Sequence, residues 1–473
     1  MRALSLVRAP LVVTAVLAAG LVLVVALLRP GRPAWEGGLR QQSPYHGTTV
    51  ATTDGGGVRP PGWAADEPIY EADVRHYTAS GTLAEFTGHL PELRSLGVGV
   101  VWLMPIFPRG VERAGGSPYA VRHQLAIDPA VGTGQDFERL VDQAHKLGMH
   151  VILDFVVNHT SWDHPWIKAH PDWYQRDASG EIRSPTADWT DVAQLDFSNA
   201  AMRTEMIRAL TWWVRDGGVD GFRFDAAWNV PPDFFAQART ELQKVKPVLF
   251  LAEADDPAYH PVTDMTYAWD LPDLYADVAA GRKPAADIDA YLAWERRTFP
   301  AGAMRLRYVT NHDIAHDSTR ARRYRGGADA FTVVTTTLPG TPLVYNGQES
   351  GLDVPLDERT RVTTQPNFAA DRHRPLMTRL LDLYRDNQAL SRGRYAKLPT
   401  DHDQSVFAFA RRHGTATVLT IANLCAEART VTIQTGGYEG AYTDVFSGTP
   451  ARVEASVTLR LPPWGFRILQ RPG

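Results

Sequence analysis

Three acidic residues lie at the downstream ends of three separate apolar runs, and their types and positions suit them to chemistry. Asp225 closes GFRFD, Glu253 closes VLFLAE and Asp313 closes RYVTNHD. A carboxylate buried without a partner is costly, so an acid at the end of a buried strand needs a reason to be there. Three carboxylates that meet at one site suit a reaction whose transition state gains positive charge, as hydrolysis of a glycosidic bond does.

Parallel strands would bring these acids together. Eight apolar, strand-like runs alternate with helical patterns, which is typical of a parallel α/β fold. Eight such strands close a (β/α)8 TIM barrel, whose strands end at the active-site face. The predicted strands are Ile69–Val74, Val98–Met104, His150–Phe155, Gly221–Asp225, Val248–Glu253, Thr263–Tyr267, Arg307–Asn311 and Pro342–Asn346.

Two further segments surround this pattern. A polar, Trp-rich stretch of about 160–196 follows the third strand and predicts a short insertion that walls one side of the site. From about Lys397 apolar residues alternate between Gly-containing turns, which predicts a C-terminal antiparallel β-sandwich. We therefore expect a catalytic barrel over 68–395 and a sandwich over 396–473.

The N-terminus carries a separate signal. The apolar run Leu11–Leu28 is longer than the about 7–15 residues of a secretory h-region and at the short end of the about 17–25 residues that span a bilayer. We expect a transmembrane signal anchor at residues 1–30, with a cleaved signal peptide as the alternative. Residues 31–67, rich in Gly and Pro, then form a flexible tether. The expected location is outside the cell, membrane-anchored or extracellular.

Composition narrows the class of protein. With 44% hydrophobic and 22% charged residues, the chain is globular. A net charge of −4 gives no electrostatic case for a nucleic-acid partner. Cys425 is the sole cysteine, which excludes a disulfide within the chain.

Six motifs, taken in order, resemble those of the α-amylase family of glycoside hydrolases, glycoside hydrolase family 13. The resemblance runs from about Ile69 to the C-terminus, and its four acid-bearing motifs follow the family's order. The motifs are SPYAVRHQLAIDPAVGT around Tyr119, DFVVNH (Asp154 to His159), GFRFD (Gly221 to Asp225), LAE (Leu251 to Glu253), TNHD (Thr310 to Asp313) and GTPLVYNGQE (Gly340 to Glu349).

The resemblance implies a role for each acid. Asp225 would be the nucleophile that forms a covalent glycosyl-enzyme. Glu253 would protonate the leaving oxygen and then deprotonate water. Asp313 would bind sugar hydroxyls and stabilise the oxocarbenium-like state. Such a mechanism retains configuration and requires the first two carboxyl groups to lie about 5–5.5 Å apart.

Four more residues would bind substrate or orient the acids. Arg223 lies two residues before Asp225, so on a strand both side chains point the same way, and the guanidinium would hold the nucleophile ionised. In the family pattern His159 and His312 would hydrogen-bond sugar hydroxyls. Tyr119 would stack on the ring at the cleavage subsite.

The chain departs from its relatives just after the nucleophile motif. Trp228 and Asn229 stand where many amylases have Lys-His, which puts substrate register and calcium binding in question. Asn158 is a calcium ligand in many relatives, and Asp188 or Asp191 could add a hard oxygen. The chemistry itself needs no cofactor, and a structural calcium stays open.

These observations predict a retaining hydrolase of α-glucosidic, mainly α-1,4, bonds in starch- or maltodextrin-like glucans. One alternative is a transglycosylase or glucosyl isomerase on the same scaffold, which would exclude water from the breakdown of the glycosyl-enzyme. The other is a non-catalytic saccharide-binding relative.

Overall fold

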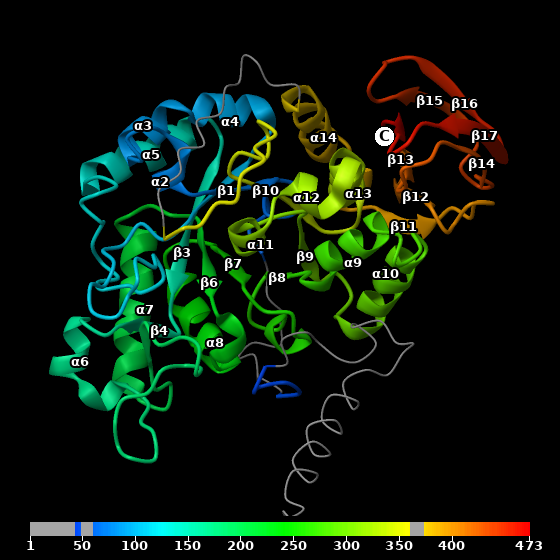
Figure 1. Cartoon of the computed structure of the whole chain (residues 1–473). Helices are drawn as coiled ribbons and strands as arrows, with labels where there is room; N and C mark the ends of the chain where they lie inside the picture. Colours follow the sequence, from blue (N-terminus) through cyan, green and yellow to red (C-terminus); the bar gives the residue numbers. More distant parts are fainter. Residues whose placement is uncertain (1–42, 49–59, 360–372) are drawn as a thin grey trace, which may run out of the picture.

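The computed structural model describes residues 43–48, 60–359 and 373–473. Its centre is a closed barrel of eight parallel strands in the order β1-β10-β9-β8-β7-β6-β3-β2, surrounded by helices (Figure 1). This confirms the predicted (β/α)8 barrel. The strands are β1 (Ile69–Ala72), β2 (Val100–Leu103), β3 (His150–Val156), β6 (Gly221–Asp225), β7 (Leu249–Ala252), β8 (Met265–Tyr267), β9 (Met304–Arg307) and β10 (Thr341–Tyr345).

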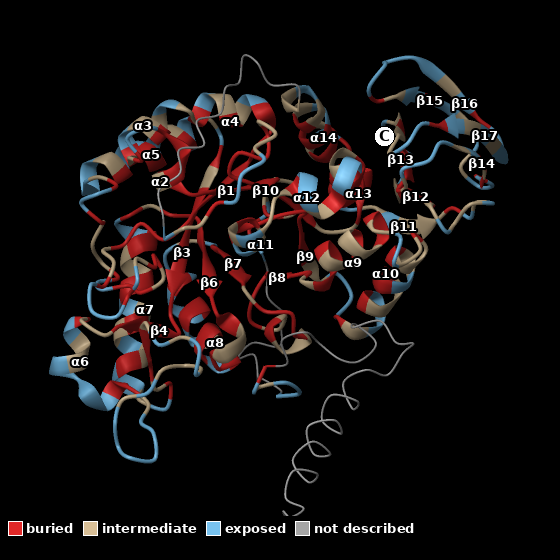
Figure 2. Ribbon diagram, viewed as in Figure 1, coloured by how far each residue is buried: buried red, intermediate tan, exposed pale blue. Residues whose placement is uncertain are grey.

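Burial explains why these strands read as continuous apolar runs. Helices cover the outside of the barrel and side chains fill its inside, so both faces of each strand are buried (Figure 2). The helices are α2 (Val74–Tyr77), α3 (Leu83–Gly88), α4 (Leu90–Leu96), α5 (Gly134–Lys146), α7 (Ala200–Arg215), α8 (Pro232–Leu242), α9 (Asp270–Ala279), α10 (Asp287–Thr298), α11 (His312–Asp317), α12 (Arg320–Tyr324), α13 (Ala328–Thr337), α14 (Arg374–Asp386) and α15 (Gln388–Ser391).

Helix α5 shows how the local sequence sets an element. The Thr133 side chain accepts a hydrogen bond from the Asp136 N–H, and the Asp136 carboxylate accepts one from the Thr133 N–H, which forms a capping box. Phe137, Leu140 and Ala144 recur at helical spacing and are buried against the barrel.

The prediction of the seventh strand was wrong in its position. Strand β9 covers Met304–Arg307, whereas Arg307–Asn311 was predicted. The chain leaves the barrel before the TNHD motif because the Asn311 Oδ1 accepts a hydrogen bond from the Ile314 N–H at 3.0 Å and caps α11. Asp313 consequently lies in the first turn of a short helix and not at the end of a strand.

The insertion after β3 folds back onto the end of that strand. Its two short strands, β4 (His159–Ser161) and β5 (Val192–Gln194), pair antiparallel, and the pairing sets His159 opposite Gln194. Helix α6 (Pro165–Ala169) lies between them in sequence and at the rim of the molecule in Figure 1. The insertion therefore enters and leaves beside the catalytic face of the barrel.

The C-terminal part forms two antiparallel sheets, with strand orders β11-β12-β13-β18-β15-β16 and β14-β17. Val406 and Leu419 from the larger sheet share one apolar cluster with Val431 and Ile433 from the smaller sheet, as in a sandwich. The strands are β11 (Arg394–Lys397), β12 (Val406–His413), β13 (Ala416–Asn423), β14 (Arg429–Gln434), β15 (Gly440–Asp444), β16 (Pro450–Val453), β17 (Ser456–Leu461) and β18 (Phe466–Arg471).

Little of the N-terminal region is described. The predicted anchor at residues 1–30 lies outside the described residues, and within them no helix combines the length and apolarity that a membrane span requires. Residues 43–48 lie against the barrel. There the Ser43 hydroxyl donates to the Trp228 carbonyl oxygen at 2.7 Å, and His46 Nδ1 lies 2.9 Å from Asp256 Oδ2.

Candidate active site

A cavity of about 200 Å³ opens at the C-terminal ends of the barrel strands. The barrel, the insertion and the loop after β10 all contribute side chains to it. Six of the predicted site residues line the cavity: Tyr119, His159, Asp225, Glu253, His312 and Asp313. The insertion adds Trp189, Asp191 and Val192. The loop after β10 adds Glu358 and Arg359. The structure thus gathers all three predicted catalytic acids around one space.

Arg223 lies beneath this cavity, fully buried, and connects the acids. Its Nη1 lies 3.2 Å from Asp225 Oδ1 and 2.9 Å from Asp154 Oδ1, while Nη2 lies 2.8 Å from Glu253 Oε2. Its Nε donates to the Tyr267 hydroxyl at 3.1 Å. One planar guanidinium therefore bridges the predicted nucleophile and the predicted general acid, through a hydrogen bond from Nη1 and through an ion pair at Nη2 that is not aligned as a hydrogen bond.

The two bridged carboxyl groups titrate as a pair. Burial raises the pKa of Glu253, and Arg223 opposes that effect. Burial and the neighbouring charge of Glu253 raise the pKa of Asp225 well above its usual range. Because two like charges share one buried site, the pair holds a proton to higher pH than two separate carboxyl groups would. Arg223 opposes the rise in the pKa of Asp225 but does not cancel it, contrary to the expectation that the guanidinium would hold Asp225 ionised. The pair thus retains a proton, and Glu253 must carry it to act as a general acid.

The residue after Asp225, the predicted nucleophile, adopts an unusual backbone conformation. Ala226 has φ 45° and ψ 35°, in the left-handed region that side chains other than glycine rarely adopt. In this conformation its N–H donates to Glu253 Oε2 at 2.7 Å. The turn that ends β6 thus holds the carboxylate that follows β7, at the expense of local strain.

His312 is part of a second charged group. Its Nδ1 hydrogen-bonds to Glu71, and its Nε2 lies 2.9 Å from the Tyr119 hydroxyl. Burial opposes a charge on the imidazole, but Asp313 and Glu71 outweigh burial and raise the pKa of His312 to about 10. The Tyr119 hydroxyl also donates to Asp154 Oδ2 at 3.2 Å. We therefore assign a proton to both ring nitrogens of His312, with Tyr119 accepting from Nε2.

The imidazole ring of His159 is neutral, whereas that of His312 is charged. Burial lowers its pKa to about 4 against the opposing effect of a hydrogen bond with the Tyr119 backbone, so the ring is neutral at ordinary pH. Its Nδ1 lies 3.1 Å from Asn158 Nδ2, and its Nε2 lies 3.8 Å from Asp225 Oδ2. The amide N–H2 of Asn158 is a donor only, so Nδ1 accepts and the ring proton is on Nε2, which faces the nucleophile.

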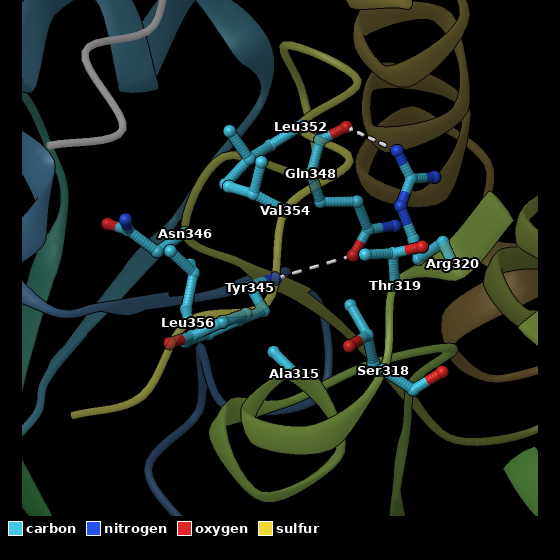
Figure 3. A pocket seen from close by; sticks show the side chains of 11 residues that line it. Ala315, Ser318, Thr319, Arg320, Tyr345, Asn346, Gln348, Leu352, Val354 and Leu356 are labelled. Carbon is cyan, nitrogen blue, oxygen red and sulfur yellow. Dashed lines mark hydrogen bonds between the residues drawn. The ribbon is translucent and has the colours of Figure 1, made fainter. Parts of the chain in front are cut away.

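A smaller cavity of about 20 Å³ lies behind α11, the helix that carries His312 and Asp313. In Figure 3, Gln348 from the loop after β10 reaches back to Tyr345, and Arg320 approaches the Gln348 carbonyl group. The Tyr345 N–H donates to Gln348 Oε1 at 3.4 Å, and Arg320 Nη2 donates to the Gln348 carbonyl oxygen at 3.0 Å (Figure 3). These bonds fix the loop to the end of β10 and to α12, the helix that follows α11.

Trp228 takes the position that is Lys in many relatives. Its carbonyl oxygen accepts from Tyr259 at 2.8 Å, and its ring centroid lies 6.1 Å from that of Trp189 in an edge-on contact. The substitution therefore adds an aromatic contact between the nucleophile loop and the insertion.

The predicted calcium ligand Asn158 has no oxygen left for an ion. Its Oδ1 accepts from Gln194 Nε2 at 3.0 Å and from Asn229 Nδ2 at 3.1 Å. Asp188 is exposed, and Asp191 lines the catalytic cavity. Calcium takes oxygen ligands, so amide nitrogens directed at the candidate oxygen do not fit it.

Sequence reasoning missed several residues that hold the site together. Glu71 pairs with His312, Trp102 Nε1 donates to Asp154 Oδ2 at 3.2 Å, and Tyr267 contacts Arg223. Glu71 could have been found by the argument applied to the three acids, because it is an acid inside the apolar strand IYEA. The aromatic partners gave no signal that would separate them from core residues.

Comparisons with known proteins agree with this geometry. The family model for the alpha amylase catalytic domain matches residues 50–191 and 173–374, and that for the maltogenic amylase C-terminal domain matches residues 395–468. The structure superposes on a maltogenic α-amylase from Thermotoga neapolitana with a TM-score of 0.79 and 31% identity, covering 86% of this chain and 98% of that one. An α-amylase from Lactobacillus plantarum gives a TM-score of 0.77 and 28% identity, with 86% and 99% covered.

Curated relatives include both amylases and transferases. Alpha-amylase 3 of Dictyoglomus thermophilum is 29% identical over 62% of this chain and 65% of its own length. Alpha-1,4-glucan:maltose-1-phosphate maltosyltransferase 1 of Streptomyces coelicolor is 30% identical over 74% of this chain and 56% of its own length. The chain thus spans less than two thirds of these relatives. With the acids gathered on a TIM barrel and both family models matched, the chain belongs to the α-amylase family and is a glycosidase-type enzyme.

Proposed function

We propose that this enzyme is a retaining hydrolase of α-glucans that cleaves mainly α-1,4 bonds in starch- or maltodextrin-like chains. The observation that carries the proposal is the single guanidinium of Arg223 that bridges Asp225 and Glu253. A shared guanidinium keeps two carboxyl groups close, and retention requires a short separation of about 5–5.5 Å. The amylases among the structural neighbours support the substrate class.

In the first step, an oxygen of Asp225 forms a bond to the anomeric carbon while the bond from that carbon to the leaving oxygen breaks. Glu253 gives its proton to the leaving oxygen. In the second step, water attacks the same carbon, Glu253 takes a proton from the water, and the bond to Asp225 breaks. Arg223 contacts both acids, so it stabilises whichever one is ionised at each stage.

The remaining side chains would hold the sugar. The charged ring of His312, the carboxylate of Asp313 and the Nε2–H of His159 all line the cavity. Sugar hydroxyls would donate to Asp313 and accept from His159, and the attraction of Asp313 would strengthen as positive charge develops. A bond from His312 to a sugar hydroxyl would replace its bond to Tyr119. The Tyr119 ring offers a flat apolar face beside them.

Substitution of Asp225 by Asn tests the assignment. The change keeps the shape but removes the nucleophile, so we expect kcat on maltoheptaose to fall at least about 10³-fold. Circular dichroism and the unfolding temperature should show a folded protein. Asp317→Asn, at a side chain that is 87% exposed, is the matched control and should keep full activity. Full activity of Asp225→Asn would overturn the assignment.

A transferase is the second candidate, because several relatives are named maltosyltransferases. Chromatography of products from maltoheptaose, with and without added maltose or phosphate, separates the two reactions. A hydrolase releases one new reducing end for each bond that is cleaved, whatever acceptor is present. Products longer than the substrate, or a sugar phosphate, would favour the transferase.

We also propose that the enzyme is exported and held at the membrane by residues 1–30. The apolar run Leu11–Leu28 supports this, and its length favours an anchor over a cleaved peptide. Cell fractionation with an antibody against the C-terminal domain tests it. The full chain should sediment with membranes until detergent is added, and its appearance in the cytosol would contradict the proposal.

A further inference from the structure

We propose that three side-chain amides take the place of a structural metal ion where the insertion joins the barrel. They belong to Asn158, Gln194 and Asn229 and are here called the amide cluster. The cluster also orients His159 toward Asp225, the proposed nucleophile. The inference goes beyond the proposed function. It rests on that function only where activity is the readout.

The side-chain nitrogen of Gln194 occupies a point where three carbonyl oxygens meet. Nε2 donates to the Asn158 backbone oxygen at 3.0 Å, to Asn158 Oδ1 at 3.0 Å and to the Leu195 backbone oxygen at 3.1 Å. Three acceptors so close require a donor, so the amide nitrogen must lie there and not the amide oxygen. A set of converging carbonyl oxygens is also what a hard cation would seek.

Asn229 completes the cluster. Its Nδ2 donates to Asn158 Oδ1 at 3.1 Å and to Gln194 Oε1 at 3.2 Å. Asn158 and Gln194 are 0% and 1% exposed, so water contributes little to their solvation. Every buried side-chain nitrogen and oxygen of the three residues has a partner, which makes the cluster complete without an ion.

The three residues come from three segments that have to be held together. Asn158 lies between β3 and β4, Gln194 lies on β5 of the insertion, and Asn229 lies in the short helix Ala227–Asn229 that follows the nucleophile strand. The Asn229 N–H also donates to the carbonyl oxygen of Ala226 at 3.0 Å. The amide cluster thus ties the insertion to the loop that adjoins Asp225.

The cluster also decides where His159 carries its proton. Because Asn158 Oδ1 accepts from two amides, the Asn158 N–H2 must turn toward His159 Nδ1, at 3.1 Å. Nδ1 then accepts, and Nε2–H faces Asp225 Oδ2 at 3.8 Å. Asn158 is a positioning residue in this scheme, because it acts on the substrate and the nucleophile only through His159.

A chelator experiment tests the replacement of the metal. The full-length protein is treated with EDTA, and its thermal unfolding is compared with that of protein in millimolar CaCl₂. A ligand that binds the folded state raises the unfolding temperature. If the protein held a structural calcium, EDTA would therefore lower the unfolding temperature and added calcium would restore it. We expect the same unfolding temperature in both. A fall of several degrees that calcium reverses would overturn the proposal.

Gln194→Glu gives the complementary test. It replaces the donor by a carboxylate facing three carbonyl oxygens, so in EDTA the unfolding temperature should fall, and calcium should restore it because the new donor set is all oxygen. Gln175→Glu, the same change at a half-buried residue of the insertion that contacts Arg183, should unfold like the wild type. If Gln194→Glu also has the unfolding temperature of the wild type in EDTA, the amide cluster does not hold the insertion against the barrel.

Asn158→Asp tests the positioning of His159. A carboxylate at this place cannot donate to Nδ1, so the ring proton moves to Nδ1 and Nε2 loses the N–H that faces Asp225. KM for maltoheptaose should therefore rise by a larger factor than kcat falls. A fall in kcat with KM unchanged would mean that Asn158 is merely structural. The unfolding measurements stand whatever the substrate, so failure of the proposed function would show only as lost turnover.

Discussion

At the scale of single residues, the site has more buried acid than base. Three buried acids, Glu71, Asp154 and Asp225, surround two buried cations, Arg223 and His312. Two further acids complete the site, the partly buried Glu253 and the exposed Asp313. Burial raises the pKa of Glu71 and of Asp154, as it does for the catalytic pair. The site therefore retains protons that isolated carboxyl groups would lose, and one of them is available to the leaving group.

Glu71→Gln should change the charge of His312. Without Glu71, burial lowers the pKa of His312 from about 10, because Asp313 alone opposes it. We expect the alkaline limb of kcat/KM to move to lower pH. The pKa of His312 is higher in the folded than in the unfolded protein, so protonation of His312 stabilises the fold. This stabilisation is complete below the unfolded pKa of about 6.5 and is lost as the pH rises toward 10. The variant should therefore lose most stability at pH 6 and least at pH 9.5.

The pH profile and thermal unfolding at those two values check this prediction. Glu92→Gln removes the partner of His89 in a half-exposed pair, and such pairs add little stability. That control should unfold like the wild type at both pH values. An unchanged alkaline limb in Glu71→Gln would show that Glu71 does not hold the charge on His312.

The acids and Arg223 could be predicted from the sequence because each stands in a motif that resembles the α-amylase family, although Asp313 lies in the first turn of α11 and not at a strand end. The partners that set their chemistry could not. A single sequence shows that Glu71 and Gln194 are polar, but their contacts with His312 and Asn158 depend on strands far apart in the chain. A buried glutamine in a short strand resembles any other polar residue until its neighbours are known.

At the scale of elements, the strands that carry the acids differ in how well the sequence predicts them. Strand β6 begins and ends at the predicted residues, Gly221 and Asp225. The seventh strand was predicted too far along the chain, because residues 305–307 (RLR) are mostly charged whereas residues 307–309 (RYV) are mostly apolar. In the structure Arg305 and Arg307 are buried on β9, paired with Glu295 of α10. Ion pairs with the preceding helix thus override the local apolar pattern.

Gly221→Ala should disturb the alignment of β6 with β7. A Cβ on Gly221 would lie 2.3 Å from the Leu249 carbonyl oxygen, so one backbone must move. We expect a loss of about 1–3 kcal/mol in stability, as in other overpacked cores. Because the displaced strands carry Asp225 and Glu253, kcat should fall as well. Urea unfolding and steady-state kinetics measure the two effects.

Gly134→Ala is the control for this change, since a Cβ there meets nothing within 4 Å and the residue begins helix α5. It should match the wild type or be slightly more stable. Equal stability and activity of Gly221→Ala would mean that the barrel accommodates the methyl group without shifting the strand ends.

At the scale of the whole molecule, the C-terminal sandwich is packed against one side of the barrel. Phe407 and Phe409 of the sandwich share an apolar cluster with Tyr275 of α9 and Phe331 of α13. The alternation of the C-terminal strands could be predicted from the sequence. Their docking could not, because the same apolar residues would suit any partner face.

Arg411 is the polar centre of this interface. It is buried, its Nη1 donates to the Thr337 carbonyl oxygen at 3.1 Å, and its Nη2 donates to those of Leu390 and Gly393 at 2.6 and 3.0 Å. Arg411→Met leaves these carbonyl groups without donors, so we expect a loss of about 3 kcal/mol or more in the free energy of unfolding. KM at a temperature below unfolding should not change.

Urea unfolding of Arg411→Met measures this loss. Arg412→Met is the matched control, because that side chain is half-buried, stacks on the Tyr438 ring of the same sandwich and donates only to the Gly437 carbonyl oxygen among the described hydrogen bonds. Its stability should stay within about 1 kcal/mol of the wild type, well short of the loss in Arg411→Met. If the two variants unfold alike, the sandwich does not depend on Arg411 for its attachment.

The links among Arg223, Asp225, Ala226 and Glu253 form a closed ring. Arg223 contacts both acids, the Ala226 N–H donates to Glu253, and Ala226 follows Asp225 in the chain. A ring of this kind tolerates little independent change. The outer wall of the cavity comes instead from Trp189 and Asp191 of the insertion and from Glu358. Substitutions in these wall segments should therefore reshape the cavity without moving the acids, whereas a change at any member of the ring disturbs the other three.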